Sequence, residues 1–281
     1  KCNSLTSITI PEGVTSIGRA AFADCKNLTS ITIPDSVSII KSEAFDDTPW
    51  FEAKLKENPL VVVNGLLIDG KTCKGDVVIP DGITYIADSA FYSCNELTSI
   101  TFPDSVTCID DHAFRYCEGL TSITIPDSVT SIGDSAFSDC SKLSSVTIPD
   151  SVTSISDYAF RFTRLTSVTI PESVKSIGKD TFEGCKLTSI RINNPECVIG
   201  DSSDTICENA TIYGYEGSTA QAYAEKYERK FVSIDSEQSS STTAPPTAVD
   251  GDANGDGNAN LADAVLILQS ISNPDKYRIS E

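Results

Sequence analysis

The sequence is poor in several residues on which common functions depend. Among 281 residues it has no methionine, one tryptophan and one histidine, and its 21 basic residues stand against 40 acidic ones, giving a net charge of −19. Nucleic acids and anionic membrane surfaces both require positive charge on their partners, so this balance argues against binding to either. The acidic net charge is typical of a soluble surface protein whose copies repel one another and which interacts with cations.

Long apolar runs are missing as well. No stretch of 18 consecutive apolar residues occurs, so we expect no transmembrane helix, although 40% hydrophobic residues are enough for a sizeable core. No signal peptide is recognisable. Because the chain begins at Lys1 inside a repeat and has no methionine, we expect it to be a fragment of a longer protein.

What the sequence does contain is an internal repeat of 23 residues. Prolines and phenylalanines each recur at intervals of 23, 46, 23, 23, 23 and 22 residues, and the interval of 46 marks one diverged unit. The unit reads C-x-x-L-T-S-I-T-I-P-D-S-V-T-S-I-G-x-x-A-F-x-x. A repeat of this length predicts a solenoid, in which each coil buries its apolar residues against the neighbouring coils. The recurring residues are Pro11, Pro34, Pro80, Pro103, Pro126, Pro149 and Pro171, and Phe22, Phe45, Phe91, Phe114, Phe137, Phe160 and Phe182.

The unit around Pro126 illustrates the expected coil. Alternation over residues 122–125 predicts a short strand with one buried face, and Pro126 ends it because proline cannot donate a ladder hydrogen bond. Val129 and Ile132 are expected to point inward from the next extended segment, and Phe137 to fill the interior. The first and last coils need caps, since they would otherwise expose the apolar column.

The diverged unit and the end of the repeat predict different local structures. Residues 48–51 predict a short helix, and residues 60–68 predict a β-hairpin with Asn64-Gly65 at its turn. We expect the single tryptophan, Trp50, to pack against the flank of the solenoid.

The repeat decays in residues 193–235, which we expect to form a C-terminal cap. They contain signals for a strand over 211–215, a helix over 219–229 with Ser218 at its N-cap, and a last strand over 231–234.

Residues 236–249 are a Ser/Thr/Pro-rich linker, and the loop after it has the spacing of an EF-hand calcium loop. Oxygen-bearing side chains occupy loop positions 1, 3, 5, 9 and 12, and Gly257 occupies position 6, where the loop must turn sharply. Ca²⁺ is a hard cation that takes six to eight oxygen ligands. The predicted ligands are the side chains of Asp252, Asn254, Asp256 and Asp263, the backbone carbonyl of Asn258, and Asn260 through a water. A helix over residues 261–270 is expected next, and Pro245-Pro246 argues against a helix before the loop.

This loop and helix resemble the first half of a dockerin, the small module that binds cohesin modules on cellulosomal scaffold proteins. The resemblance covers residues 250–273 and implies Ca²⁺-dependent binding of a cohesin partner. It assigns the cohesin contacts to two loop positions and two later helix positions, here Leu261, Ala262, Leu268 and Gln269. A dockerin has two such loops and residues 250–281 contain one, so we expect the natural chain to continue.

The repeat itself, L-T-S-I-T-I-P followed by V-T-S-I-G and A-F, resembles the BspA-like leucine-rich-repeat surface proteins. The ending Y-G-Y-E-G-S-T-A at residues 213–220 shares the resemblance, which covers residues 1–235. It implies a mainly β leucine-rich-repeat solenoid with a small helical cap, in a bacterial protein that is secreted or attached to the cell surface. It further implies adhesion or protein binding, and it supplies no catalytic residues.

The thiols and the single histidine favour structural roles. Six cysteines share one repeat position, where stacked coils would place Cα atoms about 4.8 Å apart, within disulfide range. We expect buried free thiols there, with a disulfide between coils as the alternative. His112 occupies a variable position, where other units have Ser89, Ser135 or Tyr158, and we expect no catalysis from it. The six cysteines are Cys2, Cys25, Cys94, Cys117, Cys140 and Cys185.

Threonine and serine recur on the outer face of the predicted strands, as in residues 98–101 and 121–124. Such a hydroxyl-rich surface could meet a protein or a polysaccharide. Threonine also simply suits exposed strand positions, and the sequence leaves both interpretations open.

We therefore expect a non-catalytic extracellular module. Its repeat surface binds a protein or a glycan, and its C-terminal segment docks through Ca²⁺ onto a cohesin of a cellulosome-type scaffold. The alternative is the non-catalytic part of a secreted hydrolase or peptidase whose catalytic module precedes Lys1. In a third hypothesis the chain is an adhesin and the calcium loop is only a local clip.

Overall fold

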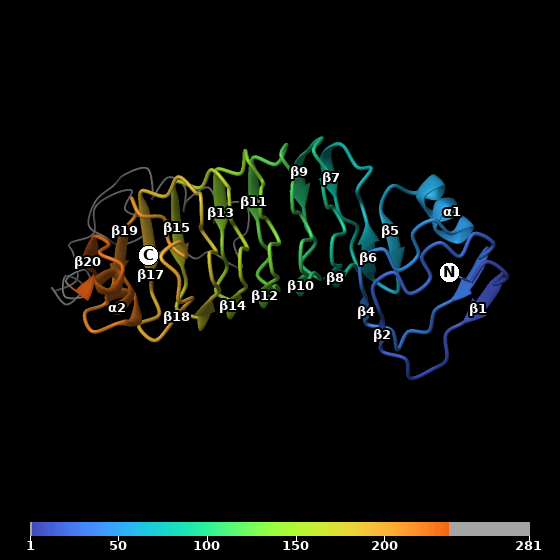
Figure 1. Cartoon of the computed structure of the whole chain (residues 1–281), viewed down its shortest axis with the longest axis horizontal. Coiled ribbons are helices and arrows are strands. Elements are labelled where there is room, and N and C mark those ends of the chain that lie inside the picture. Colours follow the sequence, from blue (N-terminus) through green and yellow to red (C-terminus); the bar gives the residue numbers. More distant parts are fainter. Residues whose placement is uncertain (1, 236–281) are drawn as a thin grey trace, which may run out of the picture. The chain divides into compact units, whose positions relative to one another are not determined.

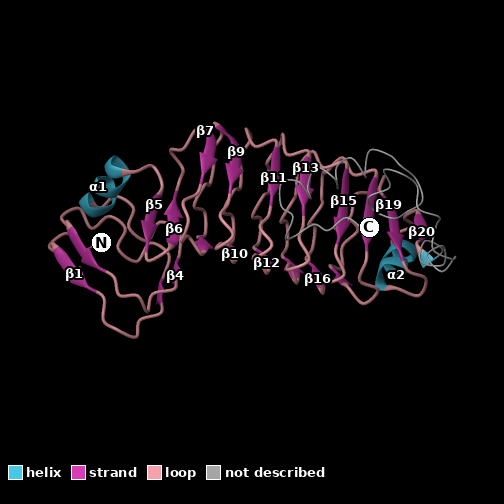
Figure 2. Cartoon of the chain, turned by 180° about the vertical axis from the view of Figure 1, so that it is seen from behind, coloured by secondary structure: helices cyan, strands magenta, loops and turns pink. Residues whose placement is uncertain are grey.

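The computed structural model describes residues 2–235, and residues 2–233 of these lie in one compact unit built of stacked coils (Figure 1). Strands and loops follow one another through the coils, with one helix, α1 (Pro49–Glu57), beside the N-terminal coils and another, α2 (Thr219–Lys226), beside the last ones (Figure 2). The predicted mainly β solenoid is confirmed. Within residues 2–235, no helix combines the length and the apolar character needed to cross a membrane.

One face of the solenoid is built from the longer strands, and we call it the long-strand ladder. Its strands are parallel and paired at the spacing of the repeat, so that Ser122 pairs with Ser145 and Thr124 with Thr147. It comprises four hydrogen-bonded sheets, β1-β3, β7-β9, β11-β13 and β15-β17-β19-β20. The strands are β1 (Ser7–Thr9), β3 (Ser30–Thr32), β7 (Gly75–Val78), β9 (Leu97–Thr101), β11 (Ser122–Thr124), β13 (Ser145–Thr147), β15 (Ser167–Ile170), β17 (Ser189–Ile192), β19 (Thr211–Gly214) and β20 (Phe231–Ser233).

A second face is built from shorter strands, which follow the prolines, and we call it the short-strand ladder. It has a two-stranded part, β2-β4, and a continuous part that runs from β18 back to β5. Pairing is again parallel, as between Ile109 and Ile132, except in the β5-β6 hairpin. The strands are β2 (Ser16–Ile17), β4 (Ile39–Ile40), β5 (Val61–Val63), β6 (Leu66–Asp69), β8 (Tyr85–Ile86), β10 (Cys108–Ile109), β12 (Ser131–Ile132), β14 (Ser154–Ile155), β16 (Ser176–Ile177) and β18 (Val198–Ile199).

The coils also bond to one another at the Ala-Phe corner, although no strand is formed there. The backbone N–H groups of His112, Phe114 and Tyr116 donate to carbonyls of the next coil at 2.7, 2.8 and 3.0 Å. His112 and Tyr116 have φ angles of 55° and 62°, and their counterparts in other coils are left-handed too. A left-handed residue other than glycine costs roughly 1–2 kcal/mol, and the bonds between coils offset this cost. We call this feature the left-handed corner.

The core is a column of phenylalanine rings, one from each regular coil. From Phe91 to Phe182 the successive rings are stacked, with centroids 4.9, 5.3, 5.4 and 5.8 Å apart, and all of them are buried. Val129 and Ile132 are buried as well, so the inward orientation predicted for the coil is confirmed.

The diverged unit interrupts this column. Thr48 caps α1 by accepting a hydrogen bond from the N–H of Phe51, and the β5-β6 hairpin turns at Asn64-Gly65, as predicted. Strand β6 joins the short-strand ladder beside β8, whereas no strand of this unit lies between β3 and β7. The buried apolar residues therefore form two clusters, one N-terminal and one running from Leu60 to the last coils.

Trp50 belongs to the N-terminal cluster. Its ring packs on Phe45 with centroids 4.8 Å apart, which confirms the packing role predicted for it.

The C-terminal segment differs in detail from its prediction. Strand β18 pairs with β16, so residues 193–210 add a further rung to the short-strand ladder. Helix α2 begins after Ser218, whose side chain accepts from the N–H of Gln221, but it ends at Lys226 instead of at residue 229. The reason is local, because Glu228 adopts a left-handed φ of 54°, which a helix cannot continue through.

Removing one ring of the phenylalanine column should destabilise the solenoid strongly. We expect Phe137→Ala to lower the free energy of unfolding by about 3–5 kcal/mol, because it leaves a cavity between two stacked rings. Denaturant unfolding followed by circular dichroism measures the loss. The matched control is Phe162→Ala, whose ring is 41% exposed, and equal losses in the two variants would contradict the role of the column.

Candidate functional site

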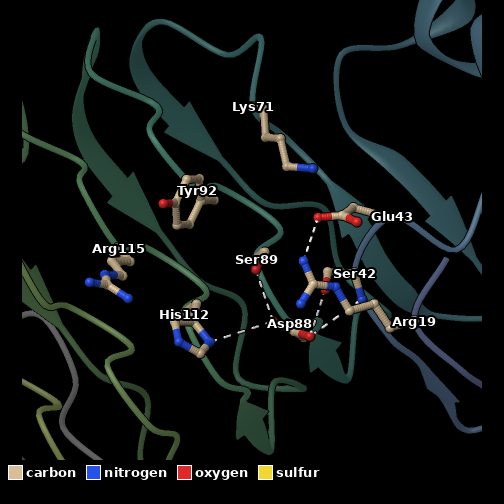
Figure 3. Close-up of a pocket in the computed structure, with 9 residues that line it drawn as sticks. All are labelled: Arg19, Ser42, Glu43, Lys71, Asp88, Ser89, Tyr92, His112 and Arg115. Atoms are coloured by element: carbon tan, nitrogen blue, oxygen red, sulfur yellow. Dashed lines mark hydrogen bonds and ion pairs between the residues drawn. The ribbon is translucent and has the colours of Figure 1, made fainter. Parts of the chain in front are cut away.

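A polar cavity lies where the diverged unit joins the regular coils. It is a cleft of about 360 Å³, within the size range of small-molecule sites, and we call it the junction cleft (Figure 3). The two apolar clusters meet at this junction, so residues from both sides line the cleft. They are Arg19, Ser42, Glu43, Lys71, Asp88, Ser89, Tyr92, His112 and Arg115.

Asp88 lines the cleft, accepts hydrogen bonds from two serines and pairs with His112 of the next coil. The hydroxyls of Ser42 and Ser89 each donate to it at 2.9 Å, the N–H of Ser42 donates at 3.4 Å, and His112 Nδ1 lies 3.8 Å away. Burial raises the pKa of Asp88, but the contact with His112 and the hydrogen bonds from Ser89 and Ser42 outweigh burial and hold the pKa well below its usual range. Asp88 is therefore an ionised anchor whose acceptor positions are already occupied.

His112 lies on the left-handed corner between two carboxylates. Its Nδ1 and Nε2 atoms are each 3.8 Å from an acid, Asp88 on one side and Asp134 on the other. The Asp88 carboxylate raises the pKa of His112 above its ordinary value of 6.5, so the imidazolium form is favoured. The nearby hydroxyls of Ser89 and Ser135 donate to Asp88 and Asp134. Within the described chain, His112 is thus an ion-pair partner between coils, and no serine is hydrogen-bonded to it as a nucleophile would be.

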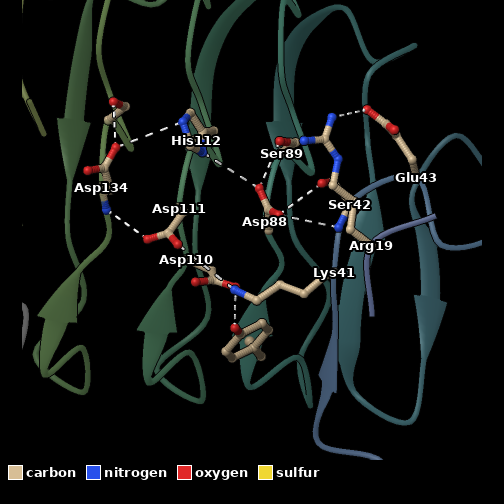
Figure 4. A network of polar contacts seen from close by, with 12 residues as sticks. Arg19, Lys41, Ser42, Glu43, Asp88, Ser89, Asp110, Asp111, His112 and Asp134 are labelled. Atoms are coloured by element: carbon tan, nitrogen blue, oxygen red, sulfur yellow. Dashed lines mark hydrogen bonds and ion pairs between the residues drawn. The ribbon is translucent and has the colours of Figure 1, made fainter. Parts of the chain in front are cut away.

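A second polar network joins the two sides of the junction below the cleft (Figure 4). Lys41 Nζ lies 2.8 Å from Asp110 Oδ2 and 3.9 Å from Asp111 Oδ2, and the hydroxyl of Tyr85 donates to Asp110. Burial and the bond to Asp110 raise the pKa of Tyr85, so the phenol stays protonated. Burial lowers the pKa of Lys41, but the bond to Asp110 outweighs it, and the net shift is upward. These contacts link strand β4 to β8 and β10 where the short-strand ladder is interrupted.

The rim of the cleft is cationic and aromatic. Arg19 donates to Glu43 at 2.8 Å and is 71% exposed, while Lys71 pairs with the buried Asp69 at 3.1 Å. Arg115 packs over an aromatic ring of its own coil, with its guanidinium 4.9 Å from the centroid of Tyr116. On the same side, the ring of Tyr92 is 37% exposed and packs edge-on against Tyr116 at 5.5 Å.

The hydroxyl-rich face predicted from the strands is also present. Thr98, Thr101, Thr121 and Thr124 are exposed on the long-strand ladder. The hydroxyls of Thr98 and Ser99 donate to Asp76 at 2.9 and 2.6 Å, so part of this face is engaged within the chain. Ligand binding by this face stays a prediction.

The comparisons with known proteins identify the repeat. The BspA type leucine-rich repeat region matches residues 1–63 and 71–211 in six copies. The chain belongs to the BspA-type leucine-rich repeat family. No curated protein matches the chain.

The chain is also similar to solved structures. A leucine-rich repeat protein from Bacteroides ovatus ATCC 8483 is 28% identical with a TM-score of 0.51, over 84% of this chain and 62% of that chain. The chain thus spans less than two thirds of that relative. The pneumococcal vaccine antigen PcpA is 17% identical with a TM-score of 0.43, over 83% of this chain and 68% of that chain. A leucine-rich repeat protein from T. pallidum is 23% identical with a TM-score of 0.38, over 82% of this chain and 86% of that chain.

The calcium and cohesin residues predicted for this BspA-type chain lie outside the described residues. These are Asp252, Asn254, Asp256, Asn258, Asn260 and Asp263 for Ca²⁺, and Leu261, Ala262, Leu268 and Gln269 for cohesin. Over residues 2–235, no three His, Cys, Asp or Glu side chains gather as ligands for one metal ion.

The cysteines of the repeat are free thiols in the structure. Cys117 and Cys140 are fully buried, and their Sγ atoms donate to the carbonyls of Phe91 and Phe114 in the preceding coil, both at 3.1 Å. Burial raises the pKa of the Cys140 thiol to about 12, and that of Cys94 to about 11. These thiols act as small hydrophobic residues, and their raised pKa values make them poor nucleophiles.

The junction cleft is the feature that sequence reasoning missed. The repeat predicts where His112 lies in its coil, but it does not predict its partners. These are Asp88 and Asp134, which lie in the coils on either side, 24 residues before His112 and 22 after it. The only sequence feature that pointed to the cleft was the diverged unit. Where it interrupts the regular stack, the coils on its two sides present different side chains to each other.

The ion pairs of His112 should make stability depend on pH. Because its pKa is raised in the folded chain, the stabilisation is fully present below the ordinary pKa of 6.5 and is lost as the pH rises through the folded pKa. We expect His112→Asn, which tolerates a left-handed φ, to be less stable than the parent at pH 5.5 and closer to it at pH 8.5. Denaturant unfolding at the two pH values measures the difference, and a gap that stays constant would contradict the ion-pair role.

Proposed function

We propose that this BspA-type chain is a secreted, non-catalytic recognition module that is attached to a larger assembly. Its repeat surface binds a protein or a glycan. Residues 250–281 dock through Ca²⁺ onto a cohesin module of a cellulosome-type scaffold. Proteins of the family are typically surface-exposed or secreted, which supports the extracellular part of the proposal.

The state of His112 is the observation that carries the non-catalytic part. A general base must be neutral at the working pH and within hydrogen-bond reach of a reacting group. His112 instead pairs with two carboxylates at 3.8 Å, and the pair with Asp88 favours the imidazolium. The junction cleft around it is suited to holding a ligand, and the hydroxyls of Ser42 and Ser89 that line it donate to Asp88, whose lowered pKa makes it a weak base.

The docking part of the proposal is supported by the sequence of the C-terminal loop. Its oxygen-bearing side chains follow the order that Ca²⁺ requires, with glycine at the sharp turn. The last ligand, Asp263, is shorter than the glutamate of a standard EF-hand. The contact residues implied for cohesin are Leu261 and Ala262, just before the last ligand, and Leu268 and Gln269, further along the expected exiting helix.

Calcium removal should abolish docking. We expect a cohesin from a scaffold panel to bind the chain in Ca²⁺ and to lose binding in EDTA, because the loop takes up its binding conformation only around the ion. The double variant Asp252→Ala with Asp256→Ala should lose binding in the same way. Isothermal titration calorimetry measures both effects.

The control is Asp81→Ala, which removes an exposed carboxylate of the solenoid and should leave cohesin binding unchanged. Calcium uptake without binding to any cohesin would reduce the loop to a local clip, as in the third hypothesis. Cohesin binding that survives EDTA would contradict the proposal directly. The alternative of an upstream hydrolase or peptidase module is tested separately, by reading the coding sequence before Lys1.

A further inference from the structure

We propose that Cys185 and Cys207 are a site of thiol–disulfide exchange, at which a low-molecular-weight disulfide oxidises the two thiols to one cross-link between neighbouring coils. Both thiols are free in the structure and belong to the last coils of the solenoid. The proposal goes beyond the recognition and docking roles given above and depends on neither of them.

The two cysteines occupy the same place in successive coils. Each stands four residues before the first residue of a strand, and these first residues, Ser189 of β17 and Thr211 of β19, are paired in register. Cys207 therefore continues the row formed by the repeat cysteines. Coils stacked in this way hold equivalent Cα atoms about 4.8 Å apart, which is within the range that a disulfide requires.

A single backbone carbonyl holds both cysteines. The carbonyl of Phe182 accepts a hydrogen bond from the backbone N–H of Cys185 at 3.2 Å and another from the thiol of Cys207 at 2.9 Å. The sulfur of Cys207 is thereby held against the turn that carries Cys185. The stacking of the coils thus brings the two side chains together without any rearrangement of the backbone.

Cys207 is the thiol that meets the oxidant. It is partly exposed, whereas Cys185 is buried. The hydrogen bond with Cys185 lowers the pKa of the Cys207 thiol, and the same contact, together with burial, raises the pKa of Cys185. Since the thiolate is the form that attacks a disulfide, both exposure and ionisation favour Cys207 as the nucleophile.

The pair is separated from the other cysteines of the row. Thr163 occupies the row position between Cys140 and Cys185, and its hydroxyl oxygen lies 3.1 Å from the Cys185 sulfur. Among the described coils, Cys207 is then the row neighbour of Cys185 that carries a thiol. An exchange that begins at Cys207 is therefore directed to Cys185.

The same geometry occurs deeper in the row, where no oxidant can reach it. The carbonyl of Phe114 accepts from the N–H of Cys117 and from the thiol of Cys140, both at 3.1 Å. Both of these cysteines are fully buried, and burial raises the pKa of each thiol. They should stay reduced, and they provide a control for the effect of exposure within the same molecule.

The reaction is a balanced exchange. The Cys207 thiolate attacks one sulfur of the small disulfide, whose sulfur–sulfur bond breaks, and one half leaves as a thiolate that takes up the proton released by Cys207. The Cys185 sulfur then attacks the Cys207 sulfur of the mixed disulfide and gives up its proton to the second half, which leaves as a thiol. Two protein thiols are oxidised, and one small disulfide is reduced to two thiols.

The cross-link would fasten the last coils to each other. It closes a loop from residue 185 to residue 207, which contains β17 and β18. A closed loop has fewer conformations in the unfolded chain, so closure stabilises the fold. We expect the oxidised chain to melt at least about 3 °C above the reduced chain.

The test exposes the whole reduced chain to oxidised glutathione under native conditions and maps the products by tandem mass spectrometry without reduction. We expect one cross-link, between Cys185 and Cys207, while Cys117 and Cys140 stay reduced. Cys185→Ser should stop the reaction at a glutathione adduct on Cys207, and Cys207→Ser should leave Cys185 without an adduct. Circular dichroism checks that the variants fold, and thermal unfolding compares the oxidised and reduced parent.

Cys197→Ser is the matched control, because it removes another buried cysteine near the pair and should leave the cross-link intact. Oxidation of Cys117 and Cys140 as fast as that of the pair would overturn the proposal. So would an adduct on Cys207 that persists while Cys185 is present, or an unchanged melting temperature after cross-linking. These readouts involve neither Ca²⁺ nor cohesin nor a ligand of the repeat surface, so their failure is distinct from failure of the proposed function.

Discussion

The structure depends on the hydrogen bonds by which each coil satisfies the backbone of the next. They run along three sides of the solenoid, the two strand ladders and the left-handed corner. Because equivalent residues are held about 4.8 Å apart, every repeated side chain forms a row. A row of phenylalanine rings is stable because the rings stack. A row of like charges is unfavourable because neighbouring charges repel one another, and at the left-handed corner His112 reduces the repulsion between Asp88 and Asp134 by lying between them.

The same constraint explains why the site lies at the diverged unit. Replacing a long strand by α1 leaves β3 and β7 without a strand between them and divides the apolar core in two. The two parts are then joined by polar contacts such as Lys41 with Asp110 and Ser42 with Asp88. Buried apolar rows leave no room for a ligand, whereas a polar junction between unlike surfaces leaves a cleft with charged walls.

Most of the fold could be predicted from the sequence, because periodicity and turn chemistry are local. The prolines fix the strand ends, the phenylalanines fix the column, and Asn64-Gly65 fixes the hairpin. The left-handed φ angles of His112 and of Glu228, which ends α2 early, could not be predicted, since both residue types are common in right-handed structure. The cleft could not be predicted either, because it joins residues such as Lys41 and Asp110, 69 positions apart, across an irregular unit.

Recognition by a solenoid also needs a point at which its symmetry is broken. On the hydroxyl-rich face, one coil offers nearly the same groups as the next, so a partner could shift by one coil at little cost in free energy. The junction cleft occurs where the repeat of 23 residues fails, and its combination of Asp88, His112 and Tyr92 is not reproduced in the neighbouring coils. A ligand bound there has a single register. The uniform face can add contact area to such an anchored partner, but it cannot by itself fix where the partner lies.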